Sequence, residues 1–113
     1  MIIDLRTYKC LPGRVPAQLE LYGKLGYPVQ QRYIGDPLCY LVTESGGLNT
    51  MVHAWVYESA ADREAKRGQM AKDPEWKSFL VENAKAGNLL EQHNWLMTPA
   101  PFAPPLTVAK PKG

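Results

Sequence analysis

The stretch that decides the fold is MVHAWVYESAADRE, residues 51–64, where a strand pattern passes directly into a helix start. Successive side chains of a strand point to opposite faces of a sheet. One face of this strand carries small aliphatic residues, and the other carries Met51, His53, Trp55 and Tyr57. We expect the small aliphatic face to pack against a helix. The large, partly polar face is then left for a second sheet or a ligand, and any functional surface is predicted there.

Two helix starts follow this strand. Ser59 is a good N-cap, and Asp62 three residues later completes a near capping box. The triplet Asp-Pro-Glu at residues 73–75 repeats the signal, with an N-cap, a proline at the first helical position and an acid that suits the helix dipole. Residues 87–88, Gly-Asn, are typical of a helix end. The second helical region is therefore predicted to consist of two segments.

The remaining sequence predicts three more strands and one more helical region. The strands are expected at residues 2–9, 38–43 and 89–97. The turn signal at residues 12–13, Pro-Gly, ends the first strand, and apolar residues at helical spacing begin at Val15. Pro28 disturbs this helix because it lacks an N–H group. We expect the helix to bend or restart there, with residues 29–33 as a separate short turn.

The order strand-helix-strand-strand-helix-strand is that of the ferredoxin-like α+β fold. It predicts a four-stranded antiparallel sheet with the first and third strands in the centre, helices on one face and the other face bare. One domain is expected over residues 1–105. Five of the ten prolines lie between Pro99 and Pro111. Residues 99–105 are therefore expected to run extended over the domain or a partner, and residues 106–113 to form a mobile tail.

Composition excludes several classes of function. The chain has 113 residues, 45% of them hydrophobic and 21% charged, which is typical of one soluble globular domain. Its 13 basic and 11 acidic residues are interspersed, so no nucleic-acid partner is expected. No apolar run is long enough to span a bilayer and no signal peptide is recognisable, which predicts a cytoplasmic protein without membrane insertion. Cys10 and Cys39 are expected to be reduced thiols.

The candidate site lies on the face that the sheet is expected to leave bare. If the odd-numbered side chains of residues 3–7 face the helices, the even-numbered side chains from Asp4 to Tyr8 share the bare face with the large residues of the third strand. On the fourth strand the face assignment stays open, because a one-residue shift in register exchanges two sets. These sets are His93, Trp95 and Met97, and Gln92, Asn94 and Leu96. The ligand-binding candidates are Arg6, Tyr8, Tyr40, His53, Trp55, Tyr57 and Trp95.

His53 and Arg6 are the candidate catalytic residues. Histidine suits proton transfer near neutral pH, so His53 is a possible general base beside an arginine that holds an anionic or enolic oxygen. In the structural alternative, His53 only hydrogen-bonds to a neighbouring strand or across a dimer, and Arg6 only pairs with Asp4 or Glu44. The aromatic candidates have a matching alternative as interface packing. No nucleophile set, metal-ligand spacing or glycine-rich phosphate loop is recognisable, so no metal or cofactor is expected.

Several segments carry a family resemblance. The segments VHAWVYESAADRE (52–64), DPEW (73–76) and NWLMTPAPF (94–102), together with LRTYKCLPGRV (5–15) and TESGGLNTMVH (43–53), resemble the NIPSNAP family in their wording and order. The resemblance covers residues 3–102. It implies a homodimer in which two sheets pair face to face as a dimeric α/β barrel and enclose a cavity. It implies no agreed biochemical activity.

Three functions remain open at this point. The first is a barrel that binds a small apolar or aromatic molecule in the sheet-lined cavity. The second is an interaction or scaffold module whose sheet face is filled by its twin. The third is a cofactor-free oxygenase or isomerase, by analogy with related dimeric barrels, although a fold does not determine a function.

Overall fold

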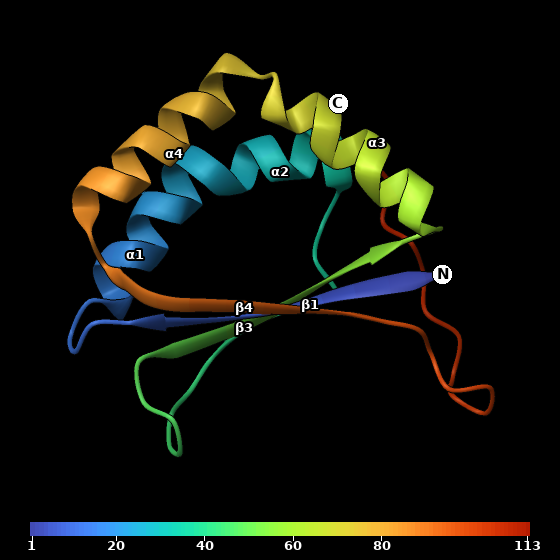
Figure 1. The fold of residues 1–113 in the computed structure, drawn as a ribbon, viewed down its shortest axis with the longest axis horizontal. Coiled ribbons are helices and arrows are strands. Elements are labelled where there is room, and N and C mark those ends of the chain that lie inside the picture. Colours follow the sequence, from blue (N-terminus) through green and yellow to red (C-terminus); the bar gives the residue numbers. More distant parts are fainter.

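A computed structural model describes residues 1–113 as one sheet covered by helices. The elements are β1 (Ile2–Cys10), α1 (Val15–Leu21), the π-helical turn η1 (Tyr22–Gly26), α2 (Tyr27–Ile34), β2 (Cys39–Val42), β3 (Thr50–Tyr57), α3 (Ala60–Ala71), α4 (Pro74–Ala86) and β4 (Leu89–Met97). The helices lie together on one side of the sheet, and no helix lies on the other (Figure 1). None of these helices has the length and apolar character needed to cross a membrane.

The sheet confirms the predicted α+β ferredoxin-like fold. Its strand order is β2-β3-β1-β4, with β1 and β3 in the centre and every neighbouring pair antiparallel. Because β3 separates β1 from β2, the two cysteines lie on strands that are not neighbours. Both Cys10 and Cys39 are free thiols.

The predicted helix ends are confirmed by their capping contacts. The side chain of Ser59 accepts a hydrogen bond from the amide of Asp62 at 3.0 Å, and Asp73 accepts one from the amide of Glu75 at 2.7 Å. Gly87 ends α4 in the left-handed conformation, with φ at 62°. These contacts fix where α3 and α4 begin, and so how they lie over the sheet.

Pro28 restarts the first helical region, as predicted, without ending it. The chain passes from α1 through the wide turn η1 into α2, where Pro28 occupies the first turn. A proline is tolerated there because the N–H groups of the first turn have no partner inside the helix. Residues 29–33, expected as a separate short turn, instead belong to α2, because the first-turn position lets the helix continue.

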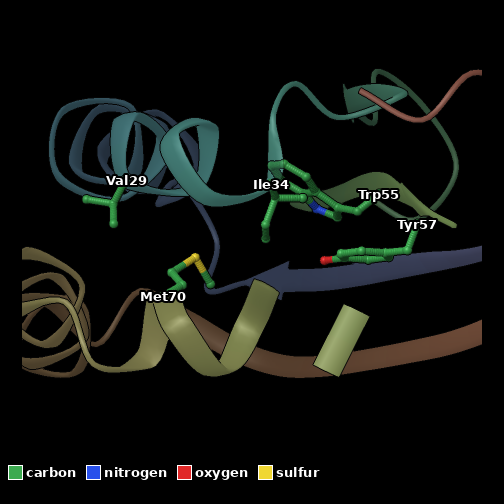
Figure 2. Close-up of a cluster of buried hydrophobic side chains, with 5 residues drawn as sticks. All are labelled: Val29, Ile34, Trp55, Tyr57 and Met70. Carbon is green, nitrogen blue, oxygen red and sulfur yellow. The ribbon is translucent and has the colours of Figure 1, made fainter. Parts of the chain in front are cut away.

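The prediction that even-numbered residues of β1 share a face with the large residues of β3 is confirmed. Asp4 pairs with Trp55 across the two strands, and Arg6 pairs with His53. The assignment of that face as the bare one is wrong. Trp55 and Tyr57 are 1% and 0% exposed and form the main core, which is completed by Val29 and Ile34 of α2 and Met70 of α3 (Figure 2). The helices cover the aromatic face because large rings supply more apolar area for burial than alanine or valine do.

The opposite face carries the small residues and is partly covered by the C-terminal segment. Ile3, Ala54 and Val56 form a second cluster, against which Leu106 and Val108 pack. The rest of this face, which we call the open face, is formed by Leu5, Thr7, Leu41, Val52, His93 and Trp95. Trp95 is 66% exposed and Leu41 is 57% exposed, so apolar side chains remain uncovered there.

The C-terminal residues return to the helix layer. The amide of Lys112 donates to the carbonyl of Gln31 at 2.8 Å, and the amide of Gly113 donates to that of Arg32 at 3.2 Å. The Gln31 carbonyl also accepts a hydrogen bond from the amide of Gly35, so the C-terminal segment adds a second bond there. In Figure 1 this segment, in red, rises beside the sheet to the helices. The expected mobility of residues 106–113 stays a prediction, but their position is against the domain.

Candidate ligand cavity

A cavity of about 250 Å³ lies between the sheet and the helix layer. We call it the interior cavity. Its polar and aromatic lining comprises Arg6, Tyr8, Gln18, Tyr22, Gln30, Tyr40, His53, Arg67, Trp76, Asn83 and Gln92, and its apolar lining comprises Phe79, Leu80 and Leu89. Concave sites that combine apolar walls with a few converging polar groups are the usual form of small-molecule sites. All residues of this lining belong to one chain. The cavity lies on the opposite side of the sheet from the open face.

Strand register places three of the predicted candidates side by side. His53 on β3 pairs with Arg6 on β1 and with Tyr40 on β2. Side chains directly opposite on neighbouring strands are close enough to interact. The Tyr40 ring stacks on the His53 ring with 4.4 Å between centroids, and the Tyr8 ring meets it edge-on at 4.8 Å. Of the seven ligand-binding candidates, four line the interior cavity: Arg6, Tyr8, Tyr40 and His53.

The proton position on His53 follows from its neighbour Trp55. The indole Nε1–H donates to His53 Nδ1 at 2.7 Å in a fully buried contact. Burial among the rings, reinforced by the charge of Arg6, lowers the pKa of His53 from 6.5 to about 4. The imidazole is therefore neutral at pH 7, and since Nδ1 accepts, the single proton is on Nε2. His53 Nε2 is buried and has no partner in the protein.

Arg6 is part of a buried ionic cluster. The carboxylate of Asp4, which is 0% exposed, lies 3.2 Å from Arg6 Nη1 and 3.1 Å from Arg63 Nε, and it also accepts a hydrogen bond from Asn94. The predicted pairing of Arg6 with Asp4 is confirmed, whereas Glu44 is exposed and takes no part. Arg6 Nε is left buried without a partner. The cluster holds the guanidinium at the cavity while leaving one of its donors free.

Tyr22 is a cavity residue that the sequence reasoning missed. Its ring stacks on Tyr40 with centroids 5.3 Å apart, and its hydroxyl donates to the side chain of Gln30. Burial raises the pKa of Tyr22 and of Tyr40, so both hydroxyls stay protonated at neutral pH. Arg67 on α3 was missed as well. Both residues lie on helical segments, Tyr22 on η1 and Arg67 on α3, whereas the sequence predicts a site made of strand residues alone.

The other candidates lie elsewhere. Trp55 and Tyr57 share the face of the cavity but are core residues that do not line it. Trp95 pairs with Leu5 and points to the open face, where a shallow hollow of about 210 Å³ is lined by Leu5, Thr7, His93, Asn94 and Trp95. This settles the fourth strand: the His93 set faces outward and the Gln92 set lies on the helix side. Trp95 and His53 therefore cannot contact one ligand within one chain.

The structure holds no group of three or more histidine, cysteine, aspartate or glutamate side chains placed to bind a metal ion. The polar residues of the interior cavity are of another kind. They are arginines, tyrosines, amides and one histidine. These groups offer hydrogen-bond donors and aromatic surface, which suits an organic ligand bearing oxygen atoms.

Solved structures with a similar fold include two from bacteria at about one-third identity. Protein Atu4242 from Agrobacterium tumefaciens is 32% identical, with a TM-score of 0.85 over 94% of this chain and 100% of that one. An uncharacterized NIPSNAP domain protein from Burkholderia xenovorans is 30% identical, with a TM-score of 0.85 over 93% of this chain and 100% of that one. A protein described as an antibiotic biosynthesis monooxygenase shares the fold, with a TM-score of 0.60 over 89% of this chain and 100% of that one, at only 15% identity.

Two curated proteins with similar sequences are NipSnap homologs. The protein NipSnap homolog of Dictyostelium discoideum is 36% identical over 73 residues, which is 65% of this chain and 32% of that protein. Human NipSnap homolog 3A is 32% identical over 84 residues, which is 71% of this chain and 32% of that protein. The chain therefore spans about a third of the length of the curated relatives it matches. The family model for NIPSNAP matches residues 3–104, almost the whole chain, and the chain belongs to the NIPSNAP family.

Proposed function

We propose that this protein binds a small aromatic molecule in the interior cavity and that it does so as a homodimer joined through the open face. The observation that carries the binding proposal is the cavity itself, whose lining includes His53 and Arg6, two residues that each have a buried nitrogen without a partner. Buried donors are nearly always satisfied in native proteins, by protein or by something bound. Tyr8, Tyr22 and Tyr40 supply the aromatic walls.

Binding is favoured over isomerase or oxygenase chemistry by the protonation states in the cavity. No carboxylate lines it, and the one histidine has its free lone pair engaged by Trp55. Tyr22 and Tyr40 have raised pKa values, so neither forms the phenolate that could act as a base near neutral pH. The cavity thus lacks an evident general base near neutral pH, and the role of His53 becomes that of a hydrogen-bond donor. The fold likeness to a monooxygenase carries no activity to this chain.

The homodimer accounts for the open face. A sheet with one uncovered apolar face is completed by a second layer, and two such sheets can pack face to face. The exposed Trp95 and Leu41 give this face the apolar character of an interface core, and the family resemblance implies the same pairing. In this arrangement each interior cavity stays within its own subunit, away from the interface. The scaffold function shares this dimer but needs no ligand.

Native mass spectrometry of the gently purified protein tests both parts. We expect a dimer that carries an additional small-molecule mass. The Leu80→Trp variant fills the cavity from an exposed lining position of α4 and should lose that mass, whereas Val81→Trp, next to it and outside the lining, should keep it. A dimer without a retained molecule in any preparation, and with no calorimetric binding of naphthalene-sized aromatics, favours the scaffold function. A monomer contradicts the pairing.

A further inference from the structure

Two residues that line the interior cavity, His53 and Arg6, each carry a buried hydrogen-bond donor without a partner in the protein. His53 is 2% exposed, its Nδ1 is occupied by the indole of Trp55, and its Nε2–H has no partner. Arg6 Nε is also buried without a hydrogen-bond partner, and Arg6 lies directly opposite His53 on the neighbouring strand. Two buried donors on paired residues of one cavity wall are unsatisfied in the protein alone. A ligand with acceptor oxygens satisfies them.

The ring of His53 is held so that this donor keeps its direction. Tyr40 stacks on one face of the imidazole, and the edge-on contact of Tyr8 and the bond from Trp55 restrict its rotation. Reversing the ring would bring the Cδ2–H group to the indole N–H in place of Nδ1, and the hydrogen bond from Trp55 would be lost. The donor character of Nε2 is thus imposed by Trp55, a residue that does not itself line the cavity.

Charge in and around the cavity favours an anion. Arg6 and Arg67 line it, and Arg63 shares the carboxylate of Asp4 with Arg6. Three guanidinium groups are therefore set against one carboxylate, and no acidic side chain belongs to the lining. Burial raises the pKa of Tyr22 on η1 and of Tyr40 on β2, so these two hydroxyls add no negative charge at pH 7. Fixed positive charge in a partly desolvated site attracts an anionic group and repels a cation.

We propose, resting on the binding function above, that the interior cavity selects aromatic molecules that bear an anionic oxygen, such as a carboxylate or an enolate. The oxygen accepts hydrogen bonds from His53 Nε2–H and from Arg6, and the aromatic frame lies against the tyrosine rings. Charge-assisted hydrogen bonds of this kind are stronger than neutral ones. Selection by charge distinguishes this site from a cavity that takes any apolar molecule of suitable size.

The test compares three probes with one aromatic frame, by calorimetry at pH 7.5. The probes are 2-naphthoate, 2-acetylnaphthalene and 2-(aminomethyl)naphthalene, which are anionic, neutral and cationic at this pH. We expect 2-naphthoate to bind at least tenfold more tightly than the neutral ketone and the cation not to bind. Equal affinity for the anion and the ketone overturns the selection by charge and leaves the binding function standing. Failure of all three probes overturns both proposals.

Two variants separate the donor role of His53 from a packing role. His53→Phe keeps an aromatic ring but removes the donor. It should weaken the binding of 2-naphthoate about tenfold while changing the affinity for the ketone little. Trp55→Phe leaves the histidine in place but frees its Nδ1. Nitrogen NMR should find the Nε2–H form alone in the unmodified protein and a mixture of both neutral forms in this variant, with weaker binding of 2-naphthoate. Unchanged binding in folded His53→Phe contradicts the proposal.

Discussion

His53 is held by neighbours that each restrict a different property of its ring. Trp55 fixes the proton on Nε2, Tyr40 and Tyr8 fix the plane, and burial beside Arg6 keeps the ring neutral. A histidine in such a setting is a poor proton acceptor in the physiological range. The same environment that weakens it as a base makes it a directed donor, which is the property that the proposed ligand site uses.

The lowered pKa of His53 predicts a pH-dependent stability. The folded protein takes up this proton only near pH 4, whereas the unfolded chain takes it up near pH 6.5. The stabilising contribution is therefore complete above pH 6.5 and is lost as the pH falls from 6.5 to about 4. A difference of this size corresponds to roughly 3 kcal/mol when the transition is complete.

Urea unfolding between pH 7.5 and pH 5 measures this effect above the range in which ordinary carboxylates titrate. The free energy of unfolding should fall over this interval. In His53→Phe, which lacks the buried histidine, this decrease in the free energy of unfolding should be smaller. His93→Gln changes the exposed histidine of β4 and should show the same decrease as the unmodified protein. An identical slope in the unmodified protein and in His53→Phe would show that His53 is not the group responsible.

At the scale of elements, the end of α2 depends on a glycine. Gly35 has a φ of 88°, and a Cβ placed there would lie 2.6 Å from the carbonyl oxygen of Lys110 and 2.9 Å from Ala109 Cβ. The C-terminal segment passes this point to reach the last carbonyls of α2. A side chain at this position is therefore excluded twice, by the backbone conformation and by the neighbouring segment.

Gly35→Ala should both strain the turn and displace the C-terminal segment. Gly46→Ala is the matched control, because Gly46 has a φ of 84° but nothing within 4 Å of its Cβ position. In each variant the free energy of unfolding should fall by roughly 1 kcal/mol or more, because alanine is strained at a positive φ. Only Gly35→Ala should also accelerate hydrogen exchange at the amide of Lys112, which donates to Gln31. Equal protection of that amide in both variants contradicts the predicted contact.

At the scale of the whole molecule, the two faces of the sheet are assigned different tasks. The helix-covered face holds the core and the interior cavity, and the open face presents Trp95 and Leu41 to the outside. The proposed assembly and the proposed ligand binding therefore use different faces, and substitutions on one face should leave the other property unchanged. Trp55 lies in the core of one chain, so Trp55→Ala should unfold the protein and not merely separate subunits.

Trp95→Arg should convert the proposed dimer to a folded monomer. A charge within an apolar sheet-to-sheet contact has no partner and is costly to bury. Leu96→Arg is the control, because Leu96 is exposed on the same strand but points to the opposite side. Analytical ultracentrifugation should find the first variant as a monomer and the second as a dimer. If Trp95→Arg sediments as the unmodified protein does, the open face is not the interface.

The sequence by itself determined the order of the elements, the helix caps and the residues that share a face. These features are local: Ser59 and Asp73 cap within three residues, and alternation along β3 needs no knowledge of distant segments. The family could also be recognised from the residues of several short sequence segments. The fold class followed from the order of strands and helices, because few topologies accommodate that order.

Only the tertiary structure decided which face of the sheet the helices cover. Alternation divides side chains into two sets but does not say which set lies inward, and here both sets of β3 contain apolar residues. The choice depends on the fit between α2, α3 and the rings of Trp55 and Tyr57, and on Leu106 and Val108 covering the small residues of the other face. Such contacts join residues distant in sequence. For the same reason the cavity, to which Tyr22 and Arg67 contribute from helices, became visible only in three dimensions.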